Sequence, residues 1–294
     1  YQVKMGERSL IEHCFRYATH WKSDKDIEIG FKFNIQKMSA NDWEANNLDA
    51  VYDTELDINN YGGYDAVNRY GDEWFSGSKI DFQPSLNLKD TLRRTGYLER
   101  DLAEYDTENL KFNSALHFRK NNNEFIYSFN FGSGTTIYQG DNRYSLKNIR
   151  FWQNKFEYNR KDNFFIRFYT THEDAGDSYD IVATAQALSD KSSSNIDWLI
   201  AYKSKFRNLL SEMQGYVKEQ DWTIYYDSFD EWQTDMIDLL ASNEDVIANY
   251  HQLAREYTDQ LLGEWQYPYL QPGTQVFDSI LNDITSKTRY NAYG

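Results

Sequence analysis

The sequence has little of what several common kinds of protein require. Cys14 is its one cysteine, so neither an internal disulfide nor a zinc site built from cysteines can form. Only three prolines occur, and no apolar run approaches the ~20 residues that a membrane-spanning helix needs. Mean hydropathy is −0.81, which excludes a helical membrane protein but leaves a strand-built one open, because such proteins have low average hydropathy.

Positive charge is also scarce. The chain has 31 Lys and Arg against 46 Asp and Glu, which gives a net charge of −15 and a pI of about 4.8. Nucleic acids bind to basic surfaces, so no nucleic-acid partner is expected. The chain begins at Tyr1, without a methionine or a signal peptide, and we expect it to be a processed or excised piece.

Aromatic side chains are abundant, at 17% of residues, and in the first half of the chain they alternate with polar ones. Every second residue from Ile27 to Ile35 is apolar, and the residues between them are polar or glycine. Successive side chains of a strand point to opposite faces, so this segment predicts a strand with one apolar and one polar face. Five further predicted strands alternate in the same way, at roughly 9–19, 109–119, 125–132, 152–158 and 164–171.

The connections between these predicted strands alternate between short and long. The short ones cover about 22–26, 120–123 and 159–163, and the long ones cover 38–106, 133–143 and the chain beyond 175. This alternation is typical of outer-membrane barrels, whose periplasmic turns are tight and whose outer loops are extended. A soluble β-sandwich usually has turns of similar size at both ends.

In the last third of the chain the apolar period becomes helical. Four apolar stripes at helical spacing lie over 196–213, 229–240, 246–261 and 277–284. Ser228 with Glu231 predicts a capping box, and Ser242 and Thr274 predict the starts of the two following helices. Gly263 predicts the end of the third helix. Each helix is too short to be stable alone, so we predict a packed helical subdomain.

Several blocks of the sequence resemble one family. The blocks read NDWEANN at 41–47, YDAVNRYGDE at 64–73, TGYLERDLAEYDTENLKFNSALHFR at 95–119, and the stretch 134–180. They are similar, in the same order, to the barrel region of TonB-dependent outer-membrane receptors of Bacteroidota, of the large type with a carboxypeptidase-like regulatory domain. The similarity covers most of residues 1–190, and the later helices are similar in placement and style only.

The resemblance implies an all-β transmembrane antiparallel barrel of about 22 strands, of which this chain would hold about six. Residues 1–175 would be barrel strands with outer loops 38–106 and 133–143, and residues 176–294 a mainly helical extracellular subdomain. The plug of the barrel and the segment that contacts TonB are not visible in this chain. The apolar residues from Ile27 to Ile35 would then face lipid, and the polar ones between them the plug-filled lumen.

The resemblance also implies a role. Members of the family import a scarce nutrient across the bacterial outer membrane with energy delivered through TonB, so no catalytic site is expected. The implied partners are outer-membrane lipid, TonB, and a surface lipoprotein or a larger outer-membrane complex. Two alternatives stay open: a receptor-like barrel that is a structural subunit of an outer-membrane assembly or secretion complex, and a soluble carbohydrate-binding β protein. Burial of Ile29, Phe31, Phe112 and Phe129 in a closed core would exclude both barrel interpretations.

Candidate ligand-binding residues lie in the predicted outer loops. Aromatic rings there could stack on a sugar or a siderophore, and arginines could meet an anionic group of a ligand. Packing within the loops or an interfacial aromatic girdle is the favoured alternative for the aromatics, and loop salt bridges explain the arginines equally well. The candidates are Trp43, Arg69, Tyr70, Trp74, Tyr138 and Arg143.

Acidic loop residues supply the hard oxygen ligands that calcium prefers, so a structural Ca²⁺ is the one metal that the sequence suggests. The candidate ligands are Asp65, Asp72, Asp174 and Asp177. No twelve-residue calcium-binding loop is present in the sequence, and no other cofactor is expected.

Overall fold

The computed structural model describes residues 2–5, 11–41, 69–71, 80–86, 88–90, 94–139, 143–261 and 267–287. The chain forms two compact units, and each unit combines segments that are distant in the sequence. The sheet unit contains Tyr1–Trp43, Ala103–Ile181 and Thr288–Gly294, and the helical unit contains Glu44–Leu102 and Val182–Lys287. The predicted boundary at residue 175 therefore lies six residues before Ile181, and most of the predicted loop 38–106 belongs to the helical unit.

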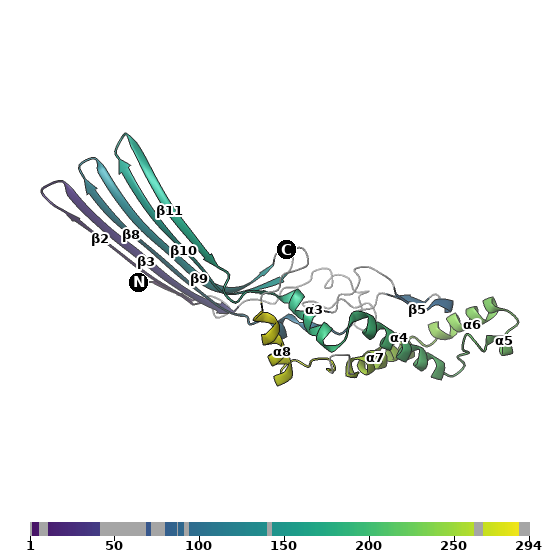
Figure 1. Ribbon diagram of the computed structural model, residues 1–294. Helices are drawn as coiled ribbons and strands as arrows, with labels where there is room; N and C mark the ends of the chain where they lie inside the picture. The colour runs from purple at the N-terminus through teal and green to yellow at the C-terminus, as the bar shows by residue number, and fades with distance from the viewer. Residues whose placement is uncertain are drawn as a thin grey trace. The chain divides into compact units, whose positions relative to one another are not determined.

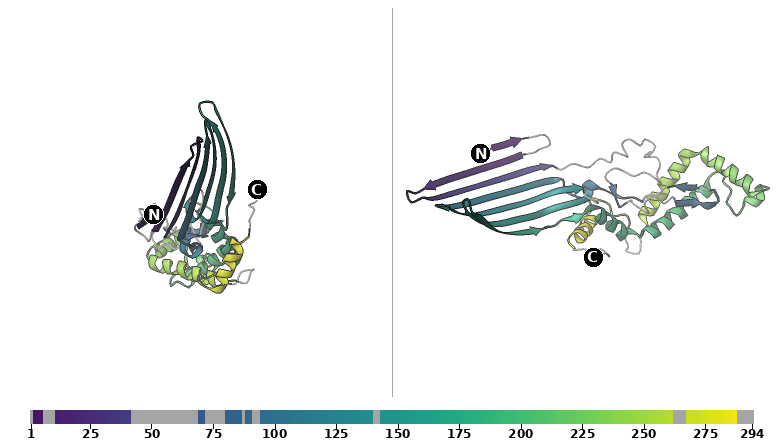
Figure 2. Two further views of the ribbon diagram at one scale, coloured as in Figure 1. Left: turned by 90° about the vertical axis from the view of Figure 1, so that its left-hand side faces the viewer. Right: turned by 90° about the horizontal axis from the view of Figure 1, so that it is seen from above.

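The sheet unit is one antiparallel sheet with the strand order β1-β2-β3-β8-β9-β10-β11, and β12 pairs with β10 beside this path. Figures 1 and 2 show the long strands lying side by side as one continuous sheet. Its edges are β1 and β11, and no described strand joins them into a closed barrel. The strands are β1 Gln2–Met5, β2 Ile11–Lys22, β3 Ile27–Asn41, β8 Asp106–Lys120, β9 Asn123–Gln139, β10 Arg143–Arg160, β11 Phe164–Asp174 and β12 Tyr179–Asp180. The six predicted strands are confirmed, each within a few residues or longer, and β1 and β12 were not predicted.

Three tight turns join neighbouring strands at one end of the sheet, as the sequence predicts. Asp26, Asn121 and Asp162 have φ values of 55°, 53° and 57° in these turns. Asp and Asn adopt this left-handed conformation more readily than other side chains, because their short polar groups can hydrogen-bond locally. The turn residues thus agree with the hairpin geometry that the structure requires.

The opposite end differs from the sequence prediction at one connection. β9 continues to Gln139 and β10 begins at Arg143, so most of the predicted loop 133–143 is strand. The ladder of these strands shifts register at a bulge between Leu146 and Ile149. Glycine, serine and threonine follow one another in β9 here, so no apolar alternation marked the segment as strand.

The helical unit combines short strands with helices, and no helix among the described residues is both long and apolar enough to cross a membrane. Its short strands are β4 Arg69–Tyr70, β5 Ile80–Gln83, β6 Leu88–Asp90 and β7 Tyr97–Leu98, paired as β4 with β7 and β5 with β6. Its helices are η1 Pro84–Leu86, α2 Glu99–Leu102, α3 Ile181–Ser192, α4 Asn195–Glu212, α5 Trp222–Tyr225, α6 Phe229–Ala241, α7 Glu244–Gln260 and α8 Gln275–Thr285. The four predicted helices are confirmed as α4, α6, α7 and α8.

The predicted helix ends are confirmed in part. Ser228 and Thr274 cap α6 and α8, because each side chain accepts a hydrogen bond from the backbone N–H three residues on. The prediction for Ser242 is wrong: this residue ends α6, where its hydroxyl donates to a carbonyl of the preceding turn, and Asn243 precedes α7. Gly263 lies outside the described residues.

The core of the helical unit forms between α4 and α7 together with α6. Trp198, Tyr202 and Phe206 are buried along one side of α4, whereas Ile196, which the predicted stripe included, is 62% exposed. His251 of α7 lies on this aromatic row: its ring stacks on Phe206 at 4.1 Å. Its Nδ1 is 2.7 Å from the Tyr202 hydroxyl oxygen.

His251 predicts a pH dependence of stability. Burial, and then the charge of Arg255, lower the pKa of His251 to about 4 in the folded protein, against about 6.5 for an unfolded chain. Between these values only the unfolded chain takes up the proton, so stability falls by up to about 3 kcal/mol as the pH drops from 6.5 to 4. His251→Asn should remove this part of the pH dependence in urea unfolding. Asp259, whose pKa burial raises, is present in both proteins and so cancels in the comparison.

The segment around Gly71 packs tightly against α3, although the two are more than a hundred residues apart. Gly71 has a φ of 80°, and a Cβ added there would lie 2.8 Å from the carbonyl oxygen of Ala185. The hydroxyl of Ser189 donates a hydrogen bond to the Gly71 carbonyl at 3.1 Å. Only glycine fits both this backbone conformation and this close approach.

Candidate functional surface

One face of the sheet is apolar from strand to strand. Ile29 of β3 pairs with Trp21 of β2 and with Phe118 of β8. Most side chains in the neighbouring rows of this face are also apolar, with polar exceptions such as Asn154 and Thr170. Phe33 shows how the rows interlock, because its ring centroid lies within 6.4 Å of four other aromatic rings. We call this surface the apolar face; it includes Trp21, Ile29, Phe31, Ile35, Leu116, Phe118, Phe125, Tyr127, Phe156, Ile166 and Phe168.

The apolar face is exposed within the described structure. Ile29 and Phe31 are 37% and 36% exposed, and Phe112 and Phe129 are half-buried. The result that would have excluded both barrel interpretations, a closed core around these four residues, is therefore not observed. Water-soluble monomers rarely expose contiguous apolar patches larger than a few hundred Å², so this face requires a covering phase or partner.

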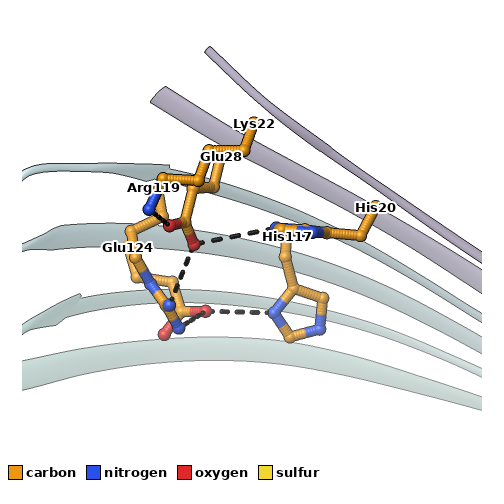
Figure 3. A network of polar contacts seen from close by, with 6 residues as sticks. All are labelled: His20, Lys22, Glu28, His117, Arg119 and Glu124. Carbon is orange, nitrogen blue, oxygen red and sulfur yellow. Dashed lines mark hydrogen bonds and ion pairs between the residues drawn. The ribbon is translucent and has the colours of Figure 1, made fainter. Parts of the chain in front are cut away.

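The opposite face of the same strands is polar, and at the tight-turn end it carries a cluster of charges (Figure 3). Glu28 lies at its centre, with Lys22 Nζ at 3.1 Å and Arg119 Nη1 at 3.2 Å from its carboxylate oxygens. Arg119 also donates to Glu124 at 3.2 Å and so links three strands. The cluster consists of His20, Lys22, Glu28, His117, Arg119 and Glu124.

Uncharged side chains continue the polar face further along the strands. Asn113 donates to Asn130 at 2.9 Å, Asn130 to Gln153 at 3.4 Å, and Gln153 to Thr171 at 3.4 Å. These residues come from four neighbouring strands and form one transverse row. The row and the charge cluster show that polar side chains of this face are bonded to one another across the strands. Neither was predicted from the sequence, because the pairs become visible only when the strand register is known.

The described ligand-binding candidates fall into two pairs, one in each unit. Arg69 and Tyr70 form β4 in the helical unit, where the Tyr70 hydroxyl donates to Glu99 at 2.8 Å. Tyr138 and Arg143 belong to the paired strands β9 and β10 of the sheet unit; Tyr138 is 54% exposed and Arg143 is buried. Their role in ligand binding stays a prediction. The candidates outside the described residues are Trp43 and Trp74.

The carboxylates of the two described calcium candidates accept hydrogen bonds at the turn after β11. An Asp174 carboxylate oxygen accepts a hydrogen bond from the Gly176 backbone N–H at 2.9 Å, and an Asp177 oxygen accepts from the Asn148 side chain at 2.8 Å. Among the residues that the structure describes, no group of three or more His, Cys, Asp or Glu is arranged to hold a metal ion. Calcium binding stays a prediction, and the candidates outside the described residues are Asp65 and Asp72.

Comparison of the chain with protein-family models, with curated proteins and with solved structures finds no match.

Proposed function

We propose that this chain is part of a TonB-dependent outer-membrane receptor that binds and imports a scarce nutrient, and that its long strands form a section of the barrel wall. The observation that carries the proposal is the two-sided sheet, with an exposed apolar face and a bonded polar face. Lipid is the phase that stabilises such an apolar face. A water-filled or plug-filled lumen suits the polar face.

The height of the apolar face supports this proposal. On β3 the apolar side chains run from Ile27 to Ile35, and Lys37 ends the series. Eight residue steps of ~3.4 Å span ~27 Å along the strand, which becomes ~21 Å along the membrane normal at a tilt of ~40°. Outer-membrane barrels have an apolar band ~25 Å tall, so the apolar side chains of β3 span most of the height of such a band.

The proposal also assigns directions. The tight turns at Asp26, Asn121 and Asp162 would lie in the periplasm, since periplasmic turns of these barrels are short. The connections at the other end of the strands, and with them the helical unit, would lie outside the cell. The import role itself depends on the family resemblance of the sequence blocks.

Spin labels on β3 can test the membrane assignment. Single cysteines at Phe31, Lys32, Phe33 and Asn34, each in a Cys14→Ser background, would carry a nitroxide in the protein in its native membrane. We expect collisions with oxygen, which concentrates in lipid, to be frequent at 31 and 33. Collisions with a water-soluble nickel complex should be frequent at 32 and 34, because successive side chains face opposite sides.

The accessibility of the same labels distinguishes the membrane proposal from the soluble alternative. High nickel accessibility at all four positions would place the apolar face in water and overturn the proposal.

Import and assembly roles are separated by deleting the gene and measuring growth on single nutrient sources. Normal growth on every nutrient, together with constant co-purification of assembly factors, would instead support a structural subunit.

A further inference from the structure

Two neighbouring apolar side chains in the short helix α5 are among the most exposed in the described part of the helical unit. Ile224 is 70% exposed and Tyr225 is 69% exposed. Isolated surface apolar residues need no explanation, but these two are adjacent and lie in a turn between two longer helices. The contacts that hold this turn in place decide whether the two side chains are kept in a fixed, exposed position.

An aromatic chain ties the turn to the buried core. The Trp222 ring packs edge-on against Phe229, with centroids 5.8 Å apart, and Phe229 packs on Trp232 at 5.1 Å. Trp232 is fully buried, and its indole N–H donates to the Val217 carbonyl at 2.9 Å. The Tyr226 backbone N–H closes the turn on the Trp222 carbonyl at 2.9 Å. The turn therefore packs the half-buried Trp222 ring toward the core and leaves Ile224 and Tyr225 exposed.

The surroundings of the turn are strongly acidic. From Lys218 to Glu231 the chain has five acidic residues, all exposed, and Lys218 is the one basic residue. The helical unit as a whole has 13 Lys and Arg against 29 Asp and Glu, a net charge of −16, while the sheet unit has 18 against 17. Such a field attracts basic surfaces and repels anionic lipid and nucleic acid. The five residues are Glu219, Asp221, Asp227, Asp230 and Glu231.

We propose that Ile224 and Tyr225 form a docking tip for a protein partner whose apolar pocket is rimmed by Lys and Arg. Protein interfaces concentrate their binding energy in a few well-held side chains, often aromatic, that enter a pocket and are surrounded by polar residues. The exposed acidic residues that flank the tip along the chain supply charge complementarity to a basic rim. This inference uses contacts within the helical unit and does not depend on the membrane proposal.

Two synthetic amphipathic peptides of equal length and apolar content, one with lysines and one with glutamates, test the docking tip on the full chain. We expect the lysine peptide to bind, and its affinity to fall about tenfold or more in the double variant Ile224→Ser, Tyr225→Ser. The matched control is Ile196→Ser, Ile200→Ser, which removes two α4 side chains that are each 62% exposed. It should change the affinity less than about twofold, because these residues are outside the tip.

Neutralising Asp221 and Asp227 to asparagine should weaken lysine-peptide binding and reduce its salt dependence. Circular dichroism on every variant checks that the helices persist. The proposal is overturned if the lysine peptide does not bind, or if the glutamate peptide binds equally. It is also overturned if the tip and control variants lose affinity equally, since net charge would then explain the binding. Binding to phosphatidylcholine vesicles that depends on Ile224 and Tyr225 would assign the tip to lipid instead.

Discussion

Leu116→Arg is expected to destabilise the membrane-inserted protein by about 2–4 kcal/mol, which is the cost of an arginine on the lipid side of a barrel near the bilayer midplane. Leu116 is 45% exposed and pairs with Phe31, which lies midway along the apolar series from Ile27 to Ile35. The measurement is urea unfolding of the protein folded into phospholipid vesicles, supported by the fraction recovered in outer membranes. A loss of about 30-fold or more in the folded-to-unfolded ratio would follow from this cost.

The matched control adds the same charge to the opposite face. Ala18 is exposed on β2 and pairs with Lys32 on the polar side of β3, so Ala18→Arg should change stability by less than about 1 kcal/mol. In a water-soluble protein both substitutions would be nearly neutral, because both sites are exposed. Equal effects of the two arginines would therefore contradict the assignment of the apolar face to lipid.

Arg94→Ala is expected to destabilise the helical unit by about 2–5 kcal/mol. Arg94 is 4% exposed, and its guanidinium donates to the carbonyl oxygens of Ser189 at 3.1 Å and Ser193 at 3.0 Å and to the Asn195 side chain at 2.7 Å. It therefore joins the end of α3 to the start of α4. Removal of the guanidinium takes a charged donor from all three acceptors, of which the Ser189 carbonyl keeps the hydrogen bond from the Ser193 N–H, and takes a positive charge away from the vicinity of Asp259.

Arg100 offers a control of the same residue type six positions away. Arg100 is exposed on α2, and Arg100→Ala should cost less than about 0.5 kcal/mol in the same unfolding experiment. Tryptophan fluorescence suits the measurement, because the Arg94 guanidinium lies 5.9 Å from the Trp198 ring centroid. A shift for Arg94→Ala no larger than that of Arg100→Ala would show that helix packing alone holds the 94–102 segment in place.

Local patterns in the sequence were sufficient for most elements of the sheet. Alternation predicted β3, β9 and β11, because every second side chain was large and apolar. Alternation did not predict the extension of β9 beyond Ser133, where small residues do not alternate between apolar and polar. It also did not predict β1, which is only four residues long. Helix caps were predictable where one side chain had one role, as at Ser228. Prediction failed at Ser242, where the ends of two helices are adjacent.

The candidate site was less predictable than the fold. The candidate residues were chosen as loop aromatics and arginines, but the structure places Arg143 buried in β10 and Tyr70 in a short strand bonded to Glu99. The charge cluster around Glu28 contains ordinary strand residues. Only pairing of β3 with β2 and β8 brings Lys22 and Arg119 to the same carboxylate.

By itself, the sequence determined which side of the six predicted strands is apolar and where four of the helices lie, because both follow from spacings of two and of three to four residues along one stretch of chain. It did not predict α3 or α5 as separate helices. The tertiary structure alone decided that Glu44–Leu102 joins Val182–Lys287 in one unit. Contacts such as Gly71 with Ala185 and Arg94 with Ser189 connect residues about a hundred positions apart. Such contacts depend on packing in three dimensions, and no local spacing encodes them.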